Sequence, residues 1–244
     1  MTRFFPFVAF SLFFAPVASW SQENTKFESM DALMGSIDEL NRFDGTVGAK
    51  PVCEPAAVKT APAKTTTTAV DRNGDRLELS VLTEAEAWEI FKDIRREKLA
   101  LKNWEVCAQR AHRIGFLLDR YGIQSGKVFV HAGLGSLVPD IKGNENGGLR
   151  WKYHVAPMVM VRRGDQIVPY IFDPAVFDAP VPQAEWERML KSHPKTSFGR
   201  VELTNRYVYL PSQSSRKMQA YDPEDLIQAA DAMNRGNSRS FRGF

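Results

Sequence analysis

The sequence contains little cysteine: its 244 residues include only Cys53 and Cys107. Small exported domains that depend on disulfide bonds carry several pairs, so this fold must depend on a hydrophobic core. No His, Cys, Asp and Glu residues have the spacing typical of a zinc site. The sequence therefore excludes a disulfide scaffold and predicts no metal ligands.

The chain also lacks a large excess of charge of one sign, and it has few long apolar runs. The chain has 32 Lys and Arg against 29 Asp and Glu, and the basic residues are scattered among acidic ones. This distribution does not form the basic stripe of a nucleic-acid-binding protein. After the apolar stretch near the N-terminus, the chain contains no run of about 18 apolar residues, the length that a membrane-spanning helix needs. We therefore expect no nucleic-acid partner and no stable membrane insertion.

The first 21 residues predict a secretory signal peptide. Arg3 supplies the positive charge, residues 4–15 are almost wholly apolar, and small residues at 17–21 offer a cleavage site. No Leu-x-x-Cys lipobox precedes an early cysteine, so no lipid anchor is expected. We expect residues 1–21 to be removed and the mature protein to be exported, to the periplasm or outside the cell.

The rest of the chain divides into three parts. Residues 22–70 predict an N-terminal pro-segment or tether, with apolar residues at helical spacing from Met30 to Leu40 and a Pro- and Thr-rich linker from Gly48 to Val70. Residues 71–215 predict a catalytic domain. Residues 216–244 predict a C-terminal helix followed by a basic tail.

Within the main domain, helical patterns precede strand patterns. Thr83-Glu84-Ala85-Glu86 is a capping box, Asn103 is the expected cap of the next helix, and Gly122 is its expected end. This order predicts an α+β fold with an antiparallel sheet. The expected helices are 83–98, 105–121, 183–191 and 222–233, and the expected strands are 77–81, 127–131, 151–161, 166–172 and 201–210.

Cys107 lies in the first turn of the second of these expected helices. An inward face of the helix is predicted by the spacing of five residues: Cys107, Ala111, Ile114, Leu118 and Tyr121. A thiol in the first turn lies near unpaired backbone N–H groups and the positive end of the helix dipole, which favour a thiolate and an oxyanion. A buried structural cysteine is the alternative.

His154 and Asp173 lie on two strands joined by a turn at Arg163-Gly164. Because this turn is midway between them, a hairpin would bring the two side chains together. An aspartate that accepts a hydrogen bond from one imidazole nitrogen leaves the other nitrogen to act as a base toward a thiol. Cys107, His154 and Asp173 therefore form a candidate catalytic triad of the papain or transglutaminase type, with Asp178 as a second candidate for the third position.

Two aromatic residues stand next to the candidate base. Trp151 and Tyr153 precede His154 on the same predicted strand. They could form a wall of the substrate-binding cleft, and packing in the core is the alternative for both.

At these residues the chain resembles the bacterial protein-glutaminase (protein-glutamine deamidase) family. The resemblance covers roughly residues 100–190 and includes every candidate triad position. The motifs that carry it are Cys107-x-x-Arg110-Ala111-His112, Lys127-Val128-Phe129-Val130, Trp151-x-Tyr153-His154-Val155-Ala156, Ile171-Phe172-Asp173-Pro174-Ala175-Val176-Phe177, Pro180-Val181 and Trp186.

The resemblance implies a papain/transglutaminase-like core in which the helix that bears the nucleophile packs on an antiparallel sheet. It implies that Cys107 is the nucleophile, His154 the acid and base, and Asp173 the orienting residue. The implied reaction hydrolyses glutamine side-chain amides of proteins or peptides to glutamate and ammonia through a thioester, with no cofactor. Family members are made with an inhibitory pro-region, so residues 22–70 are a candidate intramolecular partner.

Other interpretations remain open from the sequence. A transglutaminase, an acyltransferase or a peptidase would use the same Cys-His-Asp core, and a non-catalytic periplasmic binding protein would keep only the fold. The family enzymes carry further cysteines in disulfide bonds, and this chain lacks them. Cys53 is an unpaired thiol, part of an intermolecular bridge, or a partner of Cys107 that keeps an exported precursor latent.

Overall fold

The computed structural model describes residues 65–97, 99, 101 and 104–240, with side chains up to residue 235. The predicted signal peptide, the helical pattern at 30–40, Cys53 and Asn103 lie outside the described residues. None of the described helices is both long and apolar enough to cross a bilayer.

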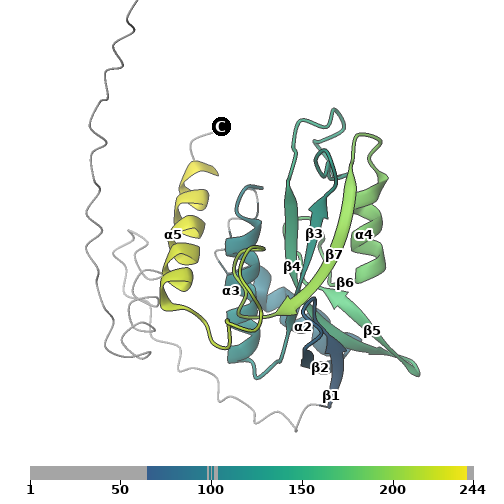
Figure 1. The fold of residues 1–244 in the computed structure, drawn as a ribbon, viewed down its shortest axis with the longest axis vertical. Helices are drawn as coiled ribbons and strands as arrows, with labels where there is room; N and C mark the ends of the chain where they lie inside the picture. The colour runs from purple at the N-terminus through teal and green to yellow at the C-terminus, as the bar shows by residue number, and fades with distance from the viewer. Residues whose placement is uncertain (1–64, 98, 100, 102–103, 241–244) are drawn as a thin grey trace, which may run out of the picture.

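The described chain has the α+β fold that the sequence predicts, and helices cover both faces of its sheet. Helix α3 (Cys107–Arg120) lies between the sheet and α5 (Pro223–Ser240), and α4 (Gln183–Ser192) covers the opposite face (Figure 1). Helix α2 (Glu84–Arg96) packs with α3 in one hydrophobic cluster that includes Phe91, Ile114 and Val159. Helix α3, which begins at Cys107, is thus enclosed from several sides.

The sheet is mixed, whereas an antiparallel sheet was predicted. β3 pairs antiparallel with the first half of β4, β5 pairs antiparallel with its second half, and β2 runs parallel to its end, with Val81 opposite Met160. Two helices and β3 separate β2 from β4 in the chain, and such a long connection permits parallel pairing. The strands are β1 (Thr66–Val70), β2 (Arg76–Thr83), β3 (Gly126–Ala132), β4 (Tyr153–Arg163), β5 (Gln166–Ile171), β6 (Val181–Pro182) and β7 (Phe198–Asn205).

Strand β1 corrects the prediction that residues 66–70 belong to a linker. It pairs antiparallel with β2 across a turn in which the Asp71 carboxylate accepts hydrogen bonds from the backbone N–H groups of Asn73 and Asp75, at 2.8 and 3.0 Å. Threonine favours strands when a partner strand is present, and a composition-based prediction does not detect that partner. The folded domain therefore extends at least to Thr66, before the predicted boundary at residue 71.

The helix ends follow local signals in the sequence. The predicted capping box is present, with the Thr83 hydroxyl accepting from the Glu86 N–H at 3.2 Å and the Glu86 carboxylate accepting from the Thr83 N–H at 2.7 Å. Gly122 ends α3 as predicted, with φ of 67°, a left-handed conformation that glycine adopts without a Cβ clash. The start of α3 differs, because its N-cap is Val106 and not Asn103, and α5 continues to Ser240, beyond the predicted end at 233.

Helix α3 is buried around most of its circumference and not along a single face. Arg110 and His112, outside the predicted inward face, are as buried as Ala111, whereas Tyr121 is 42% exposed and only caps the helix. The reason is α5, which packs along α3 on the side away from the sheet (Figure 1). The predicted C-terminal helix is thus part of the same packed unit as the site helix.

Candidate active site

Cys107 is the first residue of α3, at a helix start that has no side-chain cap. Val106 occupies the N-cap position without a side-chain hydrogen bond, and the first turn contains no acidic residue. The N–H groups of this turn, together with the helix dipole, favour a thiolate or an oxyanion at this position. The Cys107 thiol is free, and the residue is 7% exposed.

His154 and Asp173 meet through the β4–β5 hairpin. The hairpin register places Met158 opposite Ile171, and Asp173 follows the end of β5. Nε2 of His154 lies 2.7 Å from Oδ2 of Asp173, with both residues buried. This bond leaves Nδ1 as the imidazole nitrogen that is available to the thiol.

The two buried groups shift each other's ionisation in opposite directions. Burial alone lowers the pKa of His154, but the Asp173 carboxylate outweighs it and, with a smaller contribution from Cys107, raises this pKa to about 9. Burial alone raises the pKa of Asp173, but His154, Arg110 and Trp186 together bring it below its ordinary value. Both shifts favour an imidazolium next to a carboxylate.

Cys107 and His154 are close enough to interact, but they do not form a well-aligned hydrogen bond. The Cys107 side chain raises the pKa of His154 by hydrogen bonding and by charge, whereas Nδ1 of His154 has no partner with standard hydrogen-bond geometry among the described residues. Such contacts are often long in resting enzymes and tighten when substrate binds. The structure therefore brings together all three residues of the predicted triad.

Two tryptophans hold the imidazole and the carboxylate in place. The Trp151 ring stacks on the His154 ring, with centroids 4.2 Å apart and planes 10° apart, and Trp186 Nε1 donates to Asp173 Oδ2 at 3.0 Å. Trp151 is buried and lies against the base, which agrees with the packing alternative, and its contact with substrate stays a prediction. Trp186 is a member of the site that sequence reasoning treated only as part of the family motif.

Tyrosines from two elements flank the thiol. Tyr153 is half-buried and packs against the cluster that contains Cys107 and Tyr209. Burial, Cys107 and Tyr209 raise the pKa of Tyr153 to about 12, so its phenol is neutral. Substrate contact by Tyr153 stays a prediction. No sequence pattern singled out Tyr209, which lies in a region expected to be a strand.

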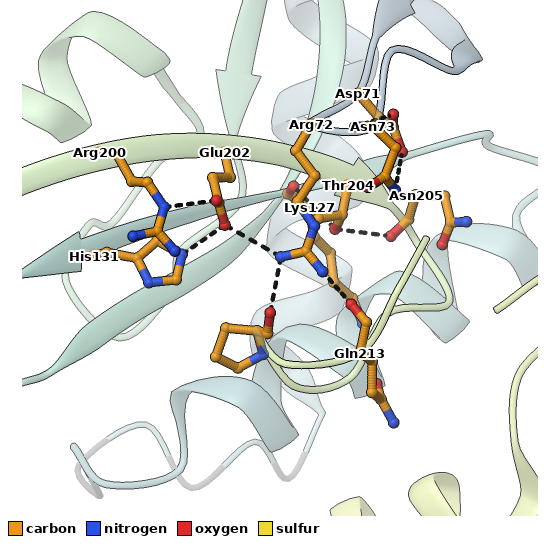
Figure 2. A network of polar contacts seen from close by, with 11 residues as sticks. Asp71, Arg72, Asn73, Lys127, His131, Arg200, Glu202, Thr204, Asn205 and Gln213 are labelled. Carbon is orange, nitrogen blue, oxygen red and sulfur yellow. Dashed lines mark hydrogen bonds and ion pairs between the residues drawn. The ribbon is translucent and has the colours of Figure 1, made fainter. Parts of the chain in front are cut away.

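Tyr209 belongs to an irregular segment, residues 206–222, that replaces the end of the predicted strand 201–210. Two basic side chains hold this segment by its carbonyl groups. Buried Lys127 donates from Nζ to Val208 O at 2.6 Å. Half-buried Arg72 donates to Pro211 O at 2.8 Å and to Gln213 O (Figure 2). Lys127 Nζ also lies 2.7 Å from His112 Nδ1 on α3. These contacts hold Tyr209 beside the site helix.

The remaining candidates lie away from the triad. Asp178, the second candidate for the third position, has a side chain that is 94% exposed and pairs with Arg95, so the structure does not bring it to His154. His131 lies 2.8 Å from Glu202, in a network that also includes Arg200 (Figure 2). Among the described residues, no group of three His, Cys, Asp or Glu could hold a metal ion.

The segment that carries the three candidate triad residues matches a known protein family. The family model described as Glutaminase matches residues 87–190, which include all three triad positions. This segment belongs to the glutaminase family. No curated protein matches the chain.

Solved protein-glutaminases share the fold of this chain. The NMR structure of protein-glutaminase from Chryseobacterium proteolyticum superimposes with a TM-score of 0.50 at 23% identity, and a crystal structure of protein-glutaminase does so with 0.51 at 22%. Each comparison covers 63% of this chain and 87% of the other. A mutant of pro-protein-glutaminase gives 0.50 at 22% identity, with 63% of this chain and 59% of that chain covered.

Proposed function

We propose that this chain is an exported protein-glutamine deamidase, which hydrolyses glutamine side-chain amides in proteins or peptides to glutamate and ammonia. The observation that carries the proposal is the bond from His154 Nε2 to Asp173 Oδ2, which leaves Nδ1 to a free thiol at an uncapped helix start. Family membership supports a glutaminase-type hydrolase. The solved protein-glutaminases support the choice of protein-bound glutamine as substrate.

In the first half of the reaction, the Cys107 thiolate attacks the carboxamide carbon of the glutamine side chain. The N–H groups at the start of α3 stabilise the oxyanion that develops. The His154 imidazolium, which Asp173 stabilises, protonates the leaving nitrogen, and ammonia departs. The product of this half is a thioester between Cys107 and the substrate.

In the second half, water replaces ammonia at the same position. His154, now neutral, removes a proton from the water as it attacks the thioester carbonyl. Cys107 then leaves as the thiolate, and His154 is again protonated. A transglutaminase would differ here, because a lysine amine would take the place of water.

The test is mass spectrometry of a glutamine-rich unfolded protein, such as casein, after incubation with the purified enzyme. We expect mass increases of about one dalton at glutamine residues, as the hydrolysis of an amide to an acid requires, together with released ammonia. The Cys107→Ser variant should produce neither. The intact mass of enzyme collected after export reports whether residues 1–21 have been removed and whether residues 22–64 remain attached.

Each alternative gives a different product in this assay. Incorporation of an added primary amine at glutamine would indicate a transglutaminase, and shortened substrate chains would indicate a peptidase. An unchanged substrate with a folded enzyme whose N-terminal segment has been removed would contradict the proposal and favour a binding protein.

The Trp186→Phe variant tests the support of Asp173. Phenylalanine keeps the ring in the core but removes the N–H group that donates to the carboxylate at 3.0 Å. A hydrogen bond to a charged group contributes about 1.5–3 kcal/mol, so we expect kcat to fall about tenfold or more with little change in KM. Steady-state kinetics on a glutamine peptide measures this, and Trp88→Phe, which changes a partly exposed tryptophan on α2, should retain full activity.

A further inference from the structure

Arg110 is a buried cation of the site that the mechanism above does not use. It lies one helical turn after Cys107 on α3, and residues three apart on a helix are neighbours on its surface. Arg110 is 2% exposed and is among the largest fully buried side chains of the described residues. Burying a charged guanidinium is unfavourable in free energy, so an arginine is buried only where anionic groups compensate its charge.

The charges that act on Arg110 belong to the triad. Burial lowers the pKa of Arg110, while Asp173 and Cys107 act in the opposite direction, and the guanidinium stays protonated. His154, from β4, is the other cation next to these two acids. The titratable phenols of Tyr153 and Tyr209 are neutral, since burial and neighbouring groups raise the pKa of each to about 12.

The balance of buried charge depends on this arginine. When the thiol has given its proton to the imidazole, Cys107, His154 and Asp173 carry one net negative charge between them. Asp173 and His154 are almost completely buried, and an uncompensated buried charge is strongly unfavourable. Arg110 makes the ionised site neutral.

We propose that Arg110 is a positioning residue whose buried guanidinium supplies the counter-charge that allows the Cys107 thiolate and the Asp173 carboxylate to be ionised in the same buried site. It acts through these two groups and does not contact the substrate. The inference depends on the proposed function only in taking Cys107 as the reactive thiol.

The test follows the reactivity of the thiol itself as a function of pH. In a Cys53→Ser background, which leaves Cys107 as the only cysteine of the chain, the rate of alkylation by iodoacetamide is measured between pH 4 and pH 10. Removal of a positive charge disfavours the thiolate, so in Arg110→Met the pH of half-maximal rate should rise by about one to two units. Arg110→Lys, which keeps the charge, should stay close to the parent protein.

A folded Arg110→Met variant with the pH profile of the parent protein would overturn the proposal. A double-mutant cycle keeps it testable if this variant unfolds. If the charge of Arg110 compensates that of Asp173, the Arg110→Met/Asp173→Asn protein should be more stable to heat than Arg110→Met alone. A double variant that is no more stable would overturn the proposal.

This result is independent of the substrate. Iodoacetamide reacts with the thiol whether or not glutamine is the natural substrate, so a failure to deamidate casein would leave the alkylation profiles interpretable. An unchanged profile in Arg110→Met, with deamidation intact in the parent protein, would remove the role of Arg110 and leave the proposed function standing.

Discussion

The His154→Ala variant is expected to lose essentially all deamidation activity, with kcat/KM lower by about 10⁴-fold or more. Without the imidazole, no group holds the thiol proton, and no acid protonates the departing nitrogen. Cys107→Ala should cause a loss of similar size, and the double variant should be no worse than either single variant, because residues that act as a unit give non-additive losses. Steady-state kinetics on a glutamine peptide measures all three.

His193→Ala provides the matched control. His193 is also a largely buried histidine, but its Nδ1 accepts from the backbone N–H of Lys195 in the loop after α4, away from Cys107. Its removal is expected to cost stability and leave kcat unchanged. Losses in His154→Ala and Cys107→Ala that multiply in the double variant would show that the two residues do not act together.

The Asp173→Asn variant is expected to lower kcat by about 10³- to 10⁴-fold, as the loss of the orienting carboxylate does in serine proteases. The amide is neutral, so burial is no longer offset and the pKa of His154 falls from about 9. If the amide turns its N–H group toward Nε2, the imidazole hydrogen moves to Nδ1, the nitrogen that must accept the thiol proton. Activity at alkaline pH should therefore decline at a lower pH than in the parent protein.

The matched control for this prediction is Asp178→Asn. Asp178 lies five residues further along the chain, but its exposed side chain pairs only with Arg95 among the described contacts, and exposed ion pairs contribute little to stability. We expect nearly full activity and an unchanged pH profile. If the two substitutions had equal effects, Asp173 would not be the orienting group.

The parts of the site that could be predicted are those for which short stretches of chain suffice. Cys107 lies at a helix start that the apolar spacing indicates. His154 and Asp173 are equally far from a turn, so one hairpin is enough to join them. The family motifs then connected the helix and the hairpin, and the matched segment, residues 87–190, contains all three.

The parts that could not be predicted depend on segments that are distant in the chain. Tyr209 packs beside α3, in the cluster that contains Cys107, because Lys127 and Arg72 hold its segment by backbone carbonyl groups. Every residue has a backbone carbonyl, so no sequence pattern marks these contacts. The compensating charge of Arg110 also could not be seen, since an arginine on a helix is usually exposed. Arg110 is buried because the sheet, α2 and α5, which come from distant parts of the chain, all pack around α3.

The sequence by itself determined the helix that begins near Cys107, the hairpin that carries His154 and Asp173, and the α+β class, because capping, turns and apolar spacing act between residues close in the chain. Only the tertiary structure decided the parallel pairing of β2 with β4, the stacking of Trp151 on the imidazole, and the burial of Arg110 among the triad charges. Those features depend on which surfaces come into contact when the chain folds, and the free energy of burial is set by the complete set of neighbours and not by the residue type alone.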